Sequence, residues 1–119
     1  MDKKTRKELL EEYKQLKTYM GVIKITNNSN GKICVTAYPN LKNKWINLQG
    51  QLEMGMHPNL QLQKDWKDQG PDSFSYEVLE EKETEKVTDI RWELKQMEKL
   101  WVEKLQSCGD GGYNRKPEN

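Results

Sequence analysis

Apolar residues recur at helical spacing at both ends of the chain, with charged residues between them. Over roughly residues 3–18 this pattern predicts an amphipathic N-terminal helix, which packs one face against another element. Its apolar positions are Leu9, Tyr13, Leu16 and Met20. The same periodicity from about Val87 to Leu105 predicts the longest helix of the chain.

Two shorter helices are predicted in the middle of the chain. Asn40 is a suitable N-cap for the first, and the apolar stripe of this helix consists of Leu41, Trp45, Leu48 and Leu52. Pro58 suits the first position of the second helix, whose buried side consists of Leu60, Leu62 and Trp66. Gly70 and Pro71 end this helix.

The remaining apolar residues alternate with polar ones, as they do in strands. Residues 20–25 and 32–37 flank the turn-forming sequence 27–31, Asn-Asn-Ser-Asn-Gly, and together predict a hairpin. A third strand is expected from Phe74 to Leu79, followed by a solvated connection. The order helix, strand, strand, helix, helix, strand, helix predicts an α+β fold, with a small three-stranded antiparallel sheet flanked by helices.

Length and composition restrict this fold to one domain over residues 1–119, ending in a short tail. No apolar run follows the basic residues at the start, so no signal peptide is expected. No segment reaches the length of a membrane span. The two cysteines, Cys34 and Cys108, lack metal-type spacing and are expected to be reduced thiols. The expected compartment is the cytoplasm.

Charge is distributed unevenly along the chain. Residues 1–50 contain ten Lys and Arg against four Asp and Glu, whereas residues 51–119 contain ten against fifteen. A basic half can attract nucleic-acid phosphates. The alternative is that these lysines lie on amphipathic helices and face water, and the formal net charge of +1 favours this alternative.

Glu98 is the one carboxylate that falls inside an apolar arc. At about 100° per residue, this arc consists of Val87, Ile90, Leu94, Met97, Trp101, Val102 and Leu105. A buried carboxylate needs a partner, because desolvation of its charge is costly. The partner is either a cation, with Arg91 and Lys44 as candidates, or a bound metal or phosphate group. A third alternative is that Glu98 is exposed at the helix edge.

Three other residues carry reactive groups. Tyr38 can supply a phenol near the end of the second strand, although a packing role is the simpler interpretation. Cys34 is a potential nucleophile, but the chain has a single histidine and a buried structural thiol is favoured. That histidine, His57, is expected to help cap the helix after Pro58.

Several short motifs follow one another in the order found in the GIY-YIG nuclease superfamily, which the chain resembles over about residues 20–114. Residues 21–23, Gly-Val-Ile, and 34–36, Cys-Val-Thr, stand where the family has its two signature triplets. Lys44 stands where the family has arginine, and Glu98 stands at the metal-binding glutamate. Residues 112–114, Gly-Tyr-Asn, match the closing motif. Residues 55–66 and 74–79 look like a version common in bacterial members.

The resemblance implies a GIY-YIG-like fold with an extra N-terminal helix. Family chemistry is phosphodiester hydrolysis with a single divalent cation, Mg²⁺ or Mn²⁺. The resemblance implies that a tyrosine pair helps to activate water, arginine steadies the phosphate and glutamate holds the metal. Here Ile23 and Cys34 replace the tyrosines, Thr36 replaces a glycine, and Lys44 lacks the bidentate fork of arginine.

These departures favour a domain that has lost hydrolysis and binds nucleic acid or protein, with weak affinity for DNA. Its expected binding residues are Gly21, Lys32, Lys42 and Asn114. One alternative is an active Mg²⁺-dependent endonuclease in which Lys44, Glu98 and Tyr38 carry the chemistry. The other is an interaction protein that forms a homodimer through its N-terminal helix.

Overall fold

The computed structural model describes residues 6, 17–108 and 111–114. Its strands are β1 (Tyr19–Asn27), β2 (Ile33–Tyr38) and β3 (Phe74–Glu83), and its α-helices are α2 (Lys44–Glu53), α3 (Leu60–Gln69) and α4 (Ile90–Leu105). Two short 3-10 turns, Pro71–Ser73 and Thr84–Lys86, flank β3. The N-terminal helix expected over residues 3–18, with its apolar positions Leu9, Tyr13 and Leu16, lies almost wholly outside the described residues.

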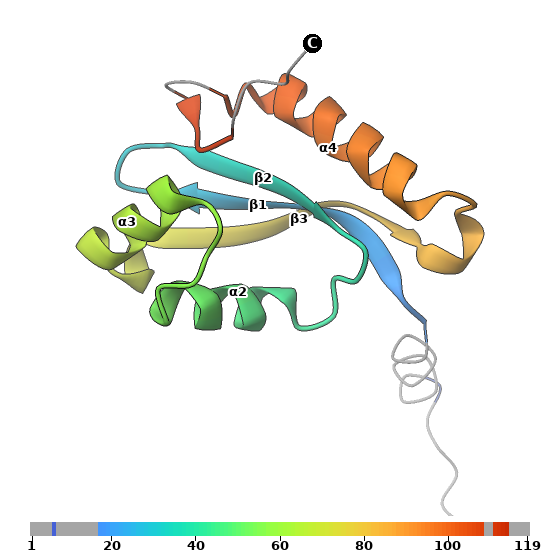
Figure 1. Cartoon of the computed structure of the whole chain (residues 1–119), viewed down its shortest axis with the longest axis horizontal. Helices are drawn as coiled ribbons and strands as arrows, with labels where there is room; N and C mark the ends of the chain where they lie inside the picture. The colour runs from blue at the N-terminus through green and yellow to red at the C-terminus, as the bar shows by residue number, and fades with distance from the viewer. Residues whose placement is uncertain (1–5, 7–16, 109–110, 115–119) are drawn as a thin grey trace, which may run out of the picture.

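The three strands form one antiparallel sheet in the order β2-β1-β3, which confirms the predicted α+β fold. Asn27 accepts the amide hydrogen of Gly31 at 2.8 Å and closes the predicted hairpin between β1 and β2. β1 is the central strand, and most of its residues are buried. Figure 1 shows α2 and α3 on one face and α4 on the other, so the domain has three layers.

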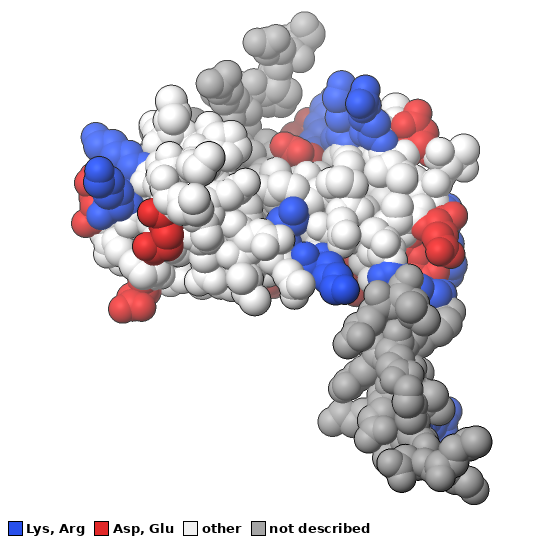
Figure 2. Space-filling view, turned by 60° about the horizontal axis from the view of Figure 1, so that its bottom comes forward, with Lys and Arg blue, Asp and Glu red and all other residues white. Residues whose placement is uncertain are grey.

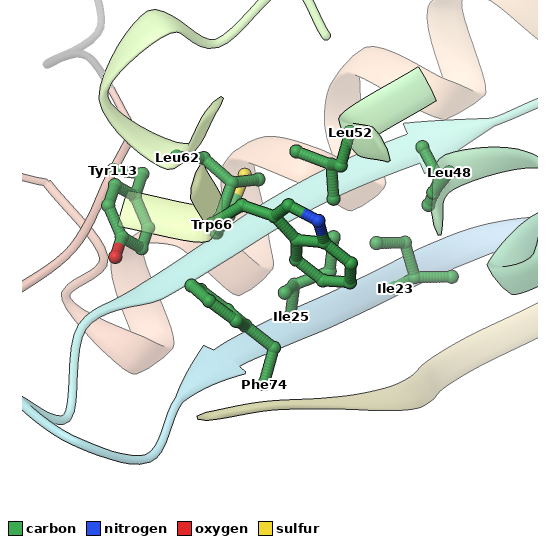
Figure 3. Packing of buried hydrophobic residues seen from close by; sticks show 9 residues of the cluster. Ile23, Ile25, Leu48, Leu52, Leu62, Trp66, Phe74 and Tyr113 are labelled. Atoms are coloured by element: carbon green, nitrogen blue, oxygen red, sulfur yellow. The ribbon is translucent and has the colours of Figure 1, made fainter. Parts of the chain in front are cut away.

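Alternating residues of β1 supply the two cores. Ile23 and Ile25 face α2 and α3, where they pack with Leu48, Leu52, Leu62, Trp66 and Phe74. Figure 3 shows Trp66 lying over this face beside Phe74, with ring centroids 5.1 Å apart. Met20 and Val22 face α4, where they pack with Val35, Met97 and Val102. The period of two along β1 therefore divides the apolar residues between the two helical layers.

Two predicted helix starts are wrong. Asn40 does not cap α2; its Oδ1 accepts the amide hydrogen of Lys42 at 2.9 Å in a local turn, and the helix begins after Asn43 in the left-handed conformation. The next helix begins at Leu60 instead of Pro58, because the side chain of Asn59 accepts from the amide of Leu62 at 3.1 Å. A short polar side chain can close a turn or cap a helix, and spacing alone does not distinguish the two.

Two other boundaries also differ. The expected solvated connection after Leu79 continues as β3 to Glu83, and its backbone pairs with β1 from Tyr19 to Val22. The last helix begins at Ile90 instead of Val87, because Asp89 caps it through the amide of Trp92 at 3.0 Å. No helix in the described part of the chain is long and apolar enough to cross a membrane.

Candidate functional site

The outer edge of β2 is where distant parts of the chain meet. The amide of Tyr113 donates to the carbonyl of Ile33 at 2.8 Å. The side chain of Asn114 accepts from the amide of Val35 at 2.8 Å and donates to its carbonyl at 2.7 Å. One step further along β2, Oε2 of Glu98 accepts from the amide of Ala37 at 3.3 Å. The edge strand is therefore covered by the closing segment and by α4.

Glu98 is half-buried at this edge. Burial raises the pKa of its carboxyl group above the ordinary value of 4.5, and the hydrogen bond from Ala37 opposes this rise. Within the described part of the chain the carboxylate forms no ion pair, so the predicted salt bridge to Arg91 or Lys44 is absent. Its partner is a backbone amide, which still leaves Oε1 available to a ligand.

Tyr38, at the end of β2, belongs to the same neighbourhood. Burial raises the pKa of its phenol to about 12, and the charges of Cys34 and Glu98 add to the rise, while a hydrogen bond with Thr36 opposes it. Tyr38 packs against the core between the sheet and the layer of α2 and α3. Glu98 therefore bonds to the backbone of the residue before Tyr38, and the Tyr38 phenol stays protonated at neutral pH.

Cys34 lies on the same face of β2 as Tyr38 and is buried, as predicted from the sequence. Its Sγ is 3.7 Å from the Thr36 hydroxyl. Burial raises the pKa of the thiol, the Thr36 contact lowers it, and the charge of Glu98 raises it further. A buried thiol with a raised pKa is a poor nucleophile, because the thiolate is the reactive form.

Lys44 is the first residue of α2 and extends over the aromatic ring of Tyr38. Its Nζ is 4.4 Å from the ring centroid, in the range of a cation–π contact. This contact holds a positive charge above the phenol while α2 fixes the start of the lysine side chain. The structure thus places Lys44 over Tyr38 and brings Glu98 to the backbone of the neighbouring residue, Ala37.

Tyr76 of β3 is a further aromatic residue on this face that the sequence did not single out. Its ring stacks on Trp45 of α2 with centroids 5.0 Å apart and an interplanar angle of 17°. Its charge in the ionised state adds to the raised pKa of Tyr38, but the strand register places Tyr76 in the row of Cys34, four residues along β2 from Tyr38. Strand alternation predicted a sheet face for Tyr76, but it gave no indication of which face carries the site.

The four predicted binding residues occupy different places. The amide of Asn114 is fully used by Val35, and Lys32 lies near Tyr113, with its Nζ 5.9 Å from the ring centroid. Lys42 is exposed in the turn before α2. A Cβ on Gly21 would meet the Glu80 carbonyl, so close packing requires glycine there. Lys42 is the one nearest along the chain to Lys44, whereas Lys32 precedes the opposite end of β2.

His57 serves the start of α3, as predicted. Its Nδ1 accepts from the amide of Asn59, the N-cap residue, at 3.0 Å. Burial lowers the pKa of the imidazole, and the bond from Asn59 opposes this. The Nδ2 of Asn59 then donates to the carbonyl of Tyr113 at 2.9 Å. His57 therefore helps to hold α3 to the closing segment.

A Mg²⁺ ion is usually held by one or two carboxylates, with waters and substrate phosphates completing its shell. Among the described residues, no group of three or more His, Cys, Asp or Glu can hold a metal. Glu98 can still supply the one carboxylate that Mg²⁺ needs. It is half-buried, and one of its oxygens forms no hydrogen bond to the described residues. A single carboxylate at this position is thus compatible with a metal ion whose other ligands are waters and a phosphate.

No protein-family model matches the chain, and no curated protein does either. Two solved structures are similar. The catalytic domain of the homing endonuclease I-TevI has 26% sequence identity and a TM-score of 0.67, covering 82% of this chain and 99% of that one. A glutamate-to-alanine mutant of the same intron endonuclease domain has 25% identity and a TM-score of 0.67, covering 81% and 92%.

Proposed function

We propose that this chain, which has the GIY-YIG-like nuclease fold, has lost phosphodiester hydrolysis and binds nucleic acid beside Lys44. The similarity to the I-TevI catalytic domain supports the fold expected from the motifs. The side chains at the positions that match the motifs support the loss of hydrolysis. The cations that remain near them support binding.

The burial of two residues carries the proposal. Ile23 and Cys34 stand where the family has its tyrosines, and their side chains are 0% and 3% exposed. Neither side chain reaches a water molecule at a bound phosphate. Tyr38 is the nearest replacement, but a phenol with a pKa of about 12 is a poor general base at neutral pH. Among the described residues, the positions that match the family's tyrosines therefore offer no group suited to remove a proton from water.

Lys44 and Lys42 remain as the cations at the start of α2. A lysine attracts a phosphate as a point charge even without the fork of arginine. Figure 2 shows that charged side chains are sparse on most of the visible face, with lysine or arginine in only a few places. We therefore expect modest affinity that falls steeply with salt, since counterion release dominates such binding.

Fluorescence anisotropy with duplex and single-stranded DNA at low salt tests the binding. We expect Lys44→Gln and Lys42→Gln each to weaken binding and to lower the salt slope by about one. Lys32→Gln tests whether the contact extends to the other end of β2. Lys67→Gln, at an exposed position in the last turn of α3, is the matched control and should leave binding unchanged. If the wild-type chain binds neither DNA at low salt, nucleic-acid binding is excluded and a protein partner remains.

An active endonuclease is the second candidate, and the free Oε1 of Glu98 near Tyr38 favours it. In that case Glu98 would hold the Mg²⁺ or Mn²⁺ ion, which when bound polarises a phosphate as a Lewis acid. Lys44 would stabilise charge on the phosphate. Tyr38 would orient the attacking water as a hydrogen-bond donor or acceptor. A cleavage assay with a Glu98 variant separates this candidate from the first.

A further inference from the structure

One edge of the sheet has no neighbouring strand among the described residues. The closing segment and α4 cover the outer edge of β2, whereas β3 pairs with β1 on one side only. The backbone groups of β3 that point away from β1 bond to no other strand in the part of the chain that the structure describes. Val78, near the middle of β3, is 41% exposed. We call this side of β3 the β3 edge. An open edge can accept a further strand, because its amides and carbonyls are already placed to form a ladder.

Charge restricts what can pair with the β3 edge. Residues 74–93 contain seven Asp and Glu against three Lys and Arg, although the formal net charge of the chain is +1. Ion pairs with lysine neutralise some of these carboxylates, as in the pair of Glu83 with Lys17 at 3.2 Å. Glu81 is exposed and forms no ion pair within the described ranges. The β3 strand of a second copy would bring acidic residues against acidic residues, which is unfavourable across strands. The edge therefore favours a basic strand.

A hollow of about 730 Å³ adjoins the end of the same strand, beside the Thr84–Lys86 turn and the start of α4. Its charged lining has four carboxylates and two lysines: Glu81, Glu83, Asp89, Glu93, Lys82 and Lys86. Trp92 also lines the hollow, and its side chain is 58% exposed. A lysine or arginine is attracted to the face of an exposed tryptophan. The hollow therefore suits a cationic side chain of a strand that pairs with the β3 edge.

We propose that the β3 edge binds an extended basic segment of a partner protein. The segment adds to the sheet as a further strand and places a lysine or arginine in the hollow beside Trp92. In this mode of recognition, backbone hydrogen bonds supply affinity and a pocket for a side chain supplies specificity. A nucleic acid is disfavoured at this edge, because its phosphates would face the same carboxylates. None of these residues takes part in the nucleic-acid contact proposed beside Lys44, so the two proposals stand independently.

Fluorescence anisotropy of a labelled short peptide of alternating lysine and threonine tests the proposal with the full chain at low salt. The same peptide with glutamate in place of lysine should not bind. Two further versions carry methyl groups on the backbone nitrogens of either the lysines or the threonines. Because alternate residues of a strand direct their amides to opposite edges, one version should lose binding and the other should keep it. If both versions bind, or neither, the peptide is not held along one edge and the proposal is overturned. Failure of the unmodified peptide to bind, or equal binding of the glutamate peptide, would also overturn it.

Two variants locate the contact on the protein. Glu81→Lys reverses a charge at the β3 edge and should weaken binding of the lysine peptide about tenfold. Trp92→Ala removes one exposed aromatic face and should weaken it about two- to fivefold. Glu103→Lys, at an exposed position in the last turn of α4, is the matched control and should bind like the wild type. The substituted positions are exposed, so the variants are expected to fold, which far-ultraviolet circular dichroism checks. Equal affinities of Glu81→Lys and Glu103→Lys would place the peptide elsewhere and overturn the proposal.

Discussion

Oε2 of Glu98 on α4 accepts a hydrogen bond from the backbone amide of Ala37 on β2, over 3.3 Å. This bond joins the long helix to the free edge of the sheet. It also brings a carboxylate to the residue before Tyr38, whose ring lies under Lys44. The three residues come from three elements, and the sheet edge is what brings them together.

The Glu98 carboxylate makes stability depend on pH. Burial raises its pKa above 4.5, so the folded chain holds this proton more tightly than the unfolded chain does. The free energy of unfolding should therefore fall as pH rises from about 4.5 through the folded pKa. The loss should stay below about 1 kcal/mol, because a half-buried carboxylate remains partly solvated.

Urea unfolding at a series of pH values measures this effect. Glu98→Gln keeps an acceptor for Ala37 and removes the titration, so it should match the wild type at acidic pH and be more stable at neutral pH. If the wild type instead gains stability relative to Glu98→Gln as the pH rises, the carboxylate has a favourable partner that offsets its burial.

The Tyr38 phenol should ionise late in an alkaline titration. Its pKa of about 12 compares with an ordinary value of 10.0, because burial and nearby negative charge disfavour the phenolate. The folded state therefore loses stability as pH rises from 10 toward 12. The difference in ultraviolet absorbance between the wild type and Tyr38→Phe should show one phenolate appearing near pH 12. A midpoint of that difference near pH 10 would mean that Tyr38 faces solvent.

Gly21 should tolerate no side chain. A Cβ at this position would meet the Glu80 carbonyl and lie 2.8 Å from Cδ1 of Leu41. Gly21→Ala should therefore destabilise the fold by about 1–3 kcal/mol, the range of overpacked cores. Gly50→Ala is the matched control and should be stabilising by up to about 1 kcal/mol, since its Cβ enters open space on a helix. Chemical denaturation of both variants checks the contrast; equal effects would contradict the packing explanation.

The hairpin, the order of elements and the burial of Cys34 could be predicted from the sequence, because alternation and turn residues act locally. The start of α2 could not, since Asn40 and Asn43 are equally plausible caps until the chain after β2 is placed. The length of β3 was underestimated because Glu80 and Glu81 suggest solvent, yet an edge strand pairs through its backbone whatever its side chains are.

The sequence proposes members of the candidate site, and it cannot indicate their contacts. Lys44, Tyr38 and Glu98 were expected from motif order or from charge on an apolar arc. The partner of Glu98 is a backbone amide, which no side-chain pattern can indicate. Tyr76 was missed because the alternation of apolar and polar residues in a strand separates its two faces but does not tell which face holds the site. Those relationships depend on strand order, which is a property of the folded sheet.

The most direct test of the central claim is a cleavage assay with plasmid, single-stranded and branched DNA in the presence of Mg²⁺ or Mn²⁺. Wild-type chain and Glu98→Ala should be compared at equal concentrations, after a urea denaturation curve has shown that both are folded. Among the described residues, buried Ile23 and Cys34 and a protonated Tyr38 offer no base in place of the family's tyrosines, so we predict that both proteins leave every substrate intact. Cleavage by the wild type that Glu98→Ala abolishes would contradict this account and establish a working nuclease.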